Sequence, residues 1–124
     1  MQYVIISRFD PQKTATLQRE LPAAAFEAID QATKADKVLD LGELTAMGVG
    51  GELARVLVDH LRHLTRLRAS GALVSGGPCA GFQYAINIFA ADTEAQAREL
   101  HDADPLARHG FFTIDQVYGW NQVF

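Results

Sequence analysis

The sequence has very little cysteine: Cys79 is the single thiol among 124 residues. One thiol cannot form an intrachain disulfide, and a metal site built from cysteines alone is excluded. Low cysteine content fits a reducing compartment, and the first eight residues lack the basic leader of a secretory signal. We therefore expect a cytoplasmic protein.

Long apolar runs are also missing, since no stretch approaches the ~20 apolar residues that a membrane-spanning helix requires. Positive charge is scarce too, with 11 basic against 15 acidic residues and a net charge of −4. Several arginines share the region 55–68, but Glu52 and Asp59 interrupt them. Because binding to a phosphate backbone needs a concentrated basic face, we expect neither a nucleic-acid nor a membrane partner.

The remaining composition is that of a globular domain, with 48% apolar and 21% charged residues. A chain of this length divided in two would leave each half too little interior, so we predict a single domain over residues 1–124. The β-branched run from Tyr3 to Ile6 predicts a strand at about 2–8, and Asp10-Pro11 has the pattern of a helix N-cap and first helical residue.

Residues from about 11 to 51 are predicted to be a mostly helical insertion after this strand. One helix begins at Pro11 and a second at Pro22. Between residues 36 and 51, apolar side chains alternate with four glycines, which weakens a continuous helix. The pattern leaves the shape of that last part open.

The clearest helix covers residues 52 to about 69. Its apolar residues recur every three to four positions, as expected for a helix with one buried face, and Gly71 ends it. The apolar stripe consists of Leu53, Val56, Leu57, Leu64 and Leu67.

Two strands and a glycine-rich connection follow this helix. Residues 72–75 are predicted to form one strand that Gly76-Gly77-Pro78 breaks. Residues 82–88 alternate between apolar and smaller or polar side chains, which is typical of a strand. We expect the two strands to form a hairpin.

The C-terminal part predicts one more helix and one more strand. Asp92 is expected to cap a helix that ends near residue 102. Residues 111–118 are then predicted to form a strand with Phe112, Ile114 and Tyr118 on one face. An aromatic tail follows from Trp120.

Without the insertion, the order of elements is βαββαβ, the split arrangement of ferredoxin-like α+β folds. This order predicts an antiparallel sheet with both main helices on one face. The other face would then expose apolar side chains, and a second copy of the chain is the simplest cover for it. We therefore predict a homodimer.

Histidines and carboxylates are the main candidates for chemistry. His60 lies on the apolar stripe of the long helix, where its ring nitrogens need hydrogen-bond partners. One interpretation is a satisfied core imidazole; another is a general base oriented by a carboxylate, for which Asp104 is the natural candidate. Asp104 is equally typical of a turn residue before Pro105.

Other chemistries have weaker support. His60 and His63 have a three-residue spacing that would suit a metal ion with His101 or His109, but the two side chains point to different sides of the helix. Cys79 has no basic neighbour in sequence that would activate its thiol. We predict neither a metal nor a cofactor.

Two blocks of this sequence resemble the YCII-related family. The first is a helical His-Leu pair followed by glycine and Gly-Pro motifs, and the second is an alanine-rich helix that ends in Asp-Pro. In this chain they are Asp59–Leu64 with Gly71–Pro78, and Ala95–Leu100 with Asp102–Pro105 and Gly110.

The resemblance implies a ferredoxin-like fold that dimerises into an α+β barrel, similar to that of muconolactone isomerases. It also implies a histidine–aspartate pair, which by position is His60 and Asp104. One family member removes hydrogen chloride from a chlorinated hydroxyquinol. This chain departs from many members by having Leu57 where they have an arginine; if that arginine binds an anionic substrate, Arg55 or Arg108 would have to replace it here, or the substrate differs.

The working hypothesis is a lyase or isomerase that needs no cofactor and acts on a cyclic or aromatic compound, with His60 as the base and Asp104 fixing its tautomer. A non-catalytic dimer that binds a small ligand is the alternative. The residues expected to bind the small molecule are Tyr3, Gly77, Pro78, Tyr84 and Trp120.

Overall fold

The computed structural model describes the chain from Met1 to Phe124 and contains one antiparallel sheet. Its strands lie in the order β2-β3-β1-β4, so the first and third strands are central. This is the strand order of the split βαββαβ arrangement, and the predicted ferredoxin-like α+β fold is confirmed. The strands are β1 (Gln2–Phe9), β2 (Leu73–Pro78), β3 (Tyr84–Ala90) and β4 (Phe112–Trp120).

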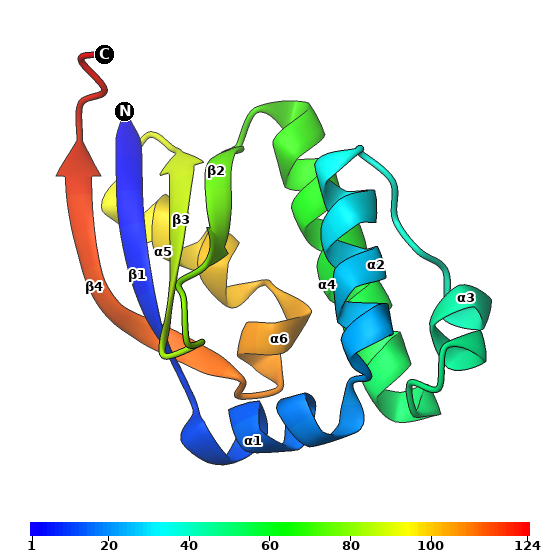
Figure 1. Ribbon diagram of the computed structural model, residues 1–124. Coiled ribbons are helices and arrows are strands. Elements are labelled where there is room, and N and C mark those ends of the chain that lie inside the picture. Colours follow the sequence, from blue (N-terminus) through cyan, green and yellow to red (C-terminus); the bar gives the residue numbers. More distant parts are fainter.

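Six helices accompany the sheet. In Figure 1, α5 and α6 lie behind the strands, while α2 and α4 run side by side next to the edge strand β2. None of the helices has both the length and the apolar character needed to cross a membrane. The helices are α1 (Pro11–Glu20), α2 (Ala23–Lys34), α3 (Leu41–Ala46), α4 (Gly51–Ser70), α5 (Glu94–Asp102) and α6 (Pro105–Arg108).

Local sequence signals explain where several helices begin and end. The Asp10 side chain accepts a hydrogen bond from the backbone N–H of Lys13 at 2.9 Å, which caps α1. Gly71 ends α4 with a positive φ of 83°, a backbone conformation that glycine adopts without the steric cost of a Cβ atom.

The insertion between β1 and α4 contributes α1, α2 and α3. Its last part, whose shape the sequence left open, contains the short helix α3, and Leu44 from that helix is fully buried. This leucine belongs to a core cluster formed by the insertion together with α4, α6 and β4. The buried members are Ala25, Leu44, Val49, Ala54, Leu57, Val58, Leu106 and Phe112.

A second core cluster lies between the sheet and α5, and it contains Ile5, Leu73, Phe89, Ala91 and Ala97. Strand pairing puts Ile5 beside Asn87 and Ser7 beside Ala85, so these four side chains share the helix side of the sheet. The alternate residues of β1 and β3 point to the opposite side, which no helix covers in Figure 1. We call this side the open face; its apolar residues include Val4, Ile6, Ile86 and Ile88.

Two predicted details at the ends of elements were wrong. Strand β2 continues through Gly76-Gly77 to Pro78, where the sequence predicted a break. Proline is tolerated there because β2 is an edge strand, on which one side needs no backbone donor. The cap of α5 is Thr93 rather than Asp92: the Thr93 hydroxyl accepts the Gln96 N–H at 3.1 Å.

The predicted common face of the last strand was also wrong. Phe112 pairs with Phe9 and Ile114 with Ser7, which places both on the helix side. An irregularity between Ile6 and Ser7 then shifts the register. Because one extra residue reverses every following side chain, Tyr118 lies on the open face.

Candidate active site

The imidazole of His60 and the carboxylate of Asp104 lie in direct contact. His60 Nδ1 is 2.7 Å from Asp104 Oδ1 and 2.9 Å from Oδ2, although 44 positions separate the two residues. Only 4% of the Asp104 surface is exposed, and 17% of the His60 side chain. Helix α4 supplies the histidine, and the turn between α5 and α6 supplies the aspartate.

A backbone hydrogen bond also holds the Asp104 carboxylate in place. Asp104 is the N-cap of α6, and its Oδ1 accepts the N–H of Leu106 at 2.9 Å. Its own N–H donates to the carbonyl of His101 at 3.1 Å. Asp104 therefore caps α6 as a turn residue before Pro105 and contacts the His60 ring at the same time.

The contact determines which nitrogen of His60 is available for chemistry. A neutral imidazole beside a carboxylate carries its hydrogen on Nδ1 and donates it to the carboxylate, which leaves the lone pair on Nε2. Nε2 has no hydrogen-bond partner within the chain, and His60 lines a cavity. An imidazole in this state can accept a proton from a molecule in that cavity.

The cavity has a volume of about 590 Å³ and lies between the sheet and helices α1, α2, α4 and α6. This volume is within the range of small-molecule sites, ~300–1,000 Å³. Apolar side chains form most of its wall, and the insertion supplies a whole side of it through Leu17, Leu21, Phe26 and Ile29.

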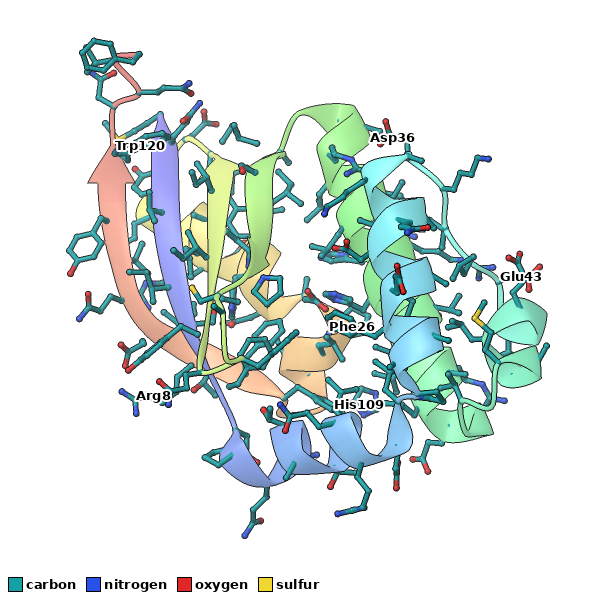
Figure 2. The ribbon with its side chains drawn as sticks, in the orientation of Figure 1. Arg8, Phe26, Asp36, Glu43, His109 and Trp120 are labelled. Atoms are coloured by element: carbon teal, nitrogen blue, oxygen red, sulfur yellow. The ribbon has the colours of Figure 1, made fainter.

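Four phenylalanines form a continuous row along this wall. The ring of Phe9 is 6.0 Å from that of Phe82 and 5.6 Å from that of Phe112, and Phe26 is 5.4 Å from Phe82. Figure 2 labels Phe26 on α2, and its contact with Phe82 connects the insertion to the turn between β2 and β3. Edge-to-face rings of this kind give the cavity aromatic surfaces suited to a flat molecule.

The residues predicted to bind a small molecule separate into two groups. Gly77 and Pro78 line the cavity together with His60 and Asp104. Tyr3, Tyr84 and Trp120 do not. Tyr3 packs against the second core cluster, the Tyr84 hydroxyl accepts a hydrogen bond from Arg8 at 3.0 Å, and Trp120 lies at the far end of β4 (Figure 2).

The expected replacements for the family's arginine are also outside the cavity. Arg55 and Arg108 do not line it, whereas Leu57 does. Arg68 is the arginine that reaches the wall, and it pairs with Asp36 and donates to the carbonyl of Thr33 at 3.1 Å.

Two polar residues near the site were missed in these roles: Asn87 was not singled out from the sequence, and His101 was considered only as a possible metal ligand. Asn87 lines the cavity from β3. His101 is 1% exposed, and its ring nitrogens contact Ser7 Oγ at 2.6 Å and Asp102 Oδ1 at 2.9 Å. The four-residue spacing from Ala97 to His101 could have placed this histidine on the buried face of α5, but its partner Ser7 is 94 positions away.

The alternative chemistries have little geometric support. No three histidine, cysteine, aspartate or glutamate side chains lie close enough together to hold a metal ion. Cys79 is a partly buried free thiol at the end of β2 and does not line the cavity. His60 and Asp104 are a histidine and a carboxylate that contact each other in the wall of this cavity.

Comparison with known proteins agrees with the fold and the motifs. The model of the YCII-related domain matches residues 45–121, more than half of the chain. The chain belongs to the YCII-related family. Among curated proteins, no sequence matches it.

A solved structure shares the fold of this YCII-related chain. It is 5-chloro-2-hydroxyhydroquinone dehydrochlorinase from Burkholderia phenoliruptrix in complex with 2,5-dihydroxybenzoquinone. The TM-score is 0.54 at 18% sequence identity, over 98% of this chain and 94% of the other. At this identity the likeness establishes the common fold and nothing about the substrate.

The contacts of His101 generate a stability prediction. Replacing His101 by Ala leaves the buried Ser7 hydroxyl without a partner and opens a small cavity beside Phe112, whose ring lies 5.2 Å from that of His101. We expect the free energy of unfolding to fall by about 2–4 kcal/mol. His109→Ala, at an exposed position, should change it by less than about 0.5 kcal/mol. Urea denaturation followed by circular dichroism measures both, and equal midpoints for the two variants would contradict the role of His101.

Proposed function

We propose that this protein is a lyase or isomerase that moves a proton on a small cyclic or aromatic compound. The observation that carries the proposal is the 2.7 Å contact between His60 Nδ1 and Asp104, with Nε2 free at the cavity wall. The pair resembles the base and orienting carboxylate of many proton-transfer sites.

In the proposed step, His60 Nε2 removes a proton from a hydroxyl group or a carbon atom of the substrate. The electron pair that this leaves either expels a leaving group, which is a lyase reaction, or moves a double bond, which is an isomerase reaction. Asp104 stabilises the imidazolium that forms, and the apolar wall excludes water from it. The proton then returns to the product or leaves with the expelled group.

Two features favour a ring as the substrate. The four phenylalanines of the wall offer flat apolar surfaces. The structural neighbour is a dehydrochlorinase of a hydroxylated chloro-aromatic compound, so a related fold supports elimination from such a ring. Proton chemistry of this kind needs no cofactor, and the cytoplasm remains the location that we propose from the sequence.

The alternative is a module that binds a small ligand without changing it, because the same fold and cavity would serve both roles. The role of His60 distinguishes the two. A base is needed for turnover, whereas a carrier needs only the shape and polarity of the wall. His60→Asn should then leave ligand affinity largely unchanged.

The enzymatic proposal is tested with a panel of hydroxylated and chlorinated ring compounds that includes 5-chloro-2-hydroxyhydroquinone. We expect the wild type to convert at least one of them and His60→Ala to lower kcat/KM by about 100-fold or more, since a positioned base contributes that much. Asp104→Asn should lower kcat, because the amide no longer selects the reactive tautomer. Chloride release and ultraviolet absorbance measure turnover.

His109→Ala is the control, since this exposed histidine lies outside the cavity. Its rate should equal that of the wild type. Activity that survives in His60→Ala would rule out the proposed base. A wild type that converts no member of the panel but binds one, with equal affinity in His60→Asn, would support the carrier instead.

We also propose that the chain forms a homodimer through the open face of its sheet. Ile86, Tyr118 and Trp120 on this face are 40%, 52% and 39% exposed, which is high for large apolar residues. A second copy would cover them with the same residues, as a two-fold interface requires.

A charge on the open face should separate the two copies. Ile86→Asp is expected to convert a dimer into a monomer, because a buried carboxylate at the interface would have no partner. Leu41→Asp is the matched control: Leu41 has almost the same exposure, 38%, but lies on α3 away from the sheet. Light scattering coupled to gel filtration measures the mass. A monomeric wild type, or a dimeric Ile86→Asp protein, would contradict the proposed interface.

A further inference from the structure

Asn87 is a polar residue of the cavity for which the chain supplies no partner. It lies on the central strand β3 and is 8% exposed, and its amide takes part in none of the side-chain hydrogen bonds of the structure. Its position opposite Ile5 directs the side chain to the helix side of the sheet, where it lines the same cavity as His60. The fully enclosed polar atoms that lack a partner do not include this amide, so its atoms are accessible from the cavity, and a molecule there can supply their hydrogen-bond partner.

The neighbouring strand is adapted to hold this amide. Gly76 of β2 pairs with Asn87, and a Cβ atom at Gly76 would lie 2.1 Å from Asn87 Oδ1. The backbone of Gly76 does not have a positive φ, so its conformation alone would admit any residue. Position 76 needs glycine because any larger side chain would occupy the space of the Asn87 amide.

The charges around the cavity determine what kind of molecule the amide could bind. Each cation of the wall has its own carboxylate, with Arg68 paired to Asp36 and Lys34 to Asp30 at 3.0 Å. The remaining carboxylate of the wall is that of Asp104, which the His60 ring contacts. An anionic ligand would enter a site without a free cation and close to a negative charge, which is unfavourable in a partly desolvated cavity.

We propose that Asn87 is the specificity residue of this cavity and that its ligand is an uncharged ring compound with a carbonyl or hydroxyl oxygen. The amide binds that oxygen, donating to a carbonyl or accepting from a hydroxyl. The aromatic wall holds the ring flat, which orients its reacting bond toward His60 Nε2. The inference depends on the proposed function in one respect: both assume that a small molecule binds in the cavity that His60 and Asn87 line.

A matched pair of ligands tests the charge preference. 4-Hydroxybenzamide and 4-hydroxybenzoate have nearly the same shape, but only the second is an anion at neutral pH. We expect calorimetric titration of the wild type to show at least about 10-fold tighter binding of the amide, a ratio that corresponds to one good hydrogen bond or one unpaired charge. Equal or tighter binding of the benzoate, or no measurable binding of the benzamide, overturns the proposal.

Variants of Asn87 and Gly76 test the residue itself. Asn87→Leu keeps the approximate volume without the amide and should weaken the binding of 4-hydroxybenzamide about 10-fold. Gly76→Ala retains the amide but forces it to move, so it should weaken binding as well. Gln83→Leu removes an exposed amide just before β3, and Gly51→Ala adds a methyl group where nothing lies within 4 Å; both should bind like the wild type.

Thermal unfolding of each variant establishes that it is folded. Wild-type affinity in folded Asn87→Leu overturns the role of the amide. The same titrations on His60→Asn separate this inference from the catalytic one. If His60→Asn keeps the preference for the uncharged ring while the wild type turns over no compound, the lyase or isomerase proposal fails and the inference on the ligand stands. If the wild type converts an anionic compound through His60, the lyase or isomerase proposal stands and the inference on an uncharged ligand fails.

Discussion

The carboxylate of Asp104 is the point at which the fold and the site depend on one another. It is almost completely buried and accepts hydrogen bonds from two elements, the Leu106 backbone N–H in α6 and the His60 ring in α4. A buried carboxylate without such donors would be strongly unfavourable. The contact therefore fixes how the long helix packs against the turn that follows α5, and the same contact orients the imidazole toward the cavity.

The insertion between β1 and α4 decides the environment of this pair. Without α1 and α2, one side of the cavity would be open, and His60 would face water. Phe26 closes part of that side through its contact with Phe82, and Leu44 anchors the insertion in the core against α4. Water excluded by an apolar wall no longer competes for the imidazole, and electrostatic interactions within the cavity become stronger. The insertion is thus part of the site and not an addition to its surface.

Much of this structure could be predicted from the sequence, and the main failures concern contacts that form only in the folded chain. The periodicity of residues 52–69 predicted α4 and the inward direction of His60, and the resemblance to the family identified Asp104 as its partner. The path of residues 36–51 depends on the packing of Leu44 into a core shared with α4, α2, α6 and β4, which no local pattern contains. Tyr84 and Trp120 were expected at the cavity because they are aromatic, but strand alternation does not reveal which face of a sheet the helices cover.

Next to His60, the two sides of the sheet differ in side-chain volume, and this difference accounts for the cavity on one side and the apolar surface on the other. On the helix side, Gly76 and Ala85 are small, so the helices above them cannot fill the space, and the hollow at His60 results. On the open side, the paired positions Ile6 and Ile86 are large and apolar. If the two sets were exchanged, the cavity would be filled and the open face would lose the surface that favours association. The small residues Gly76 and Ala85 therefore leave room for the cavity on the helix side, while Ile6 and Ile86 give the open face its apolar surface.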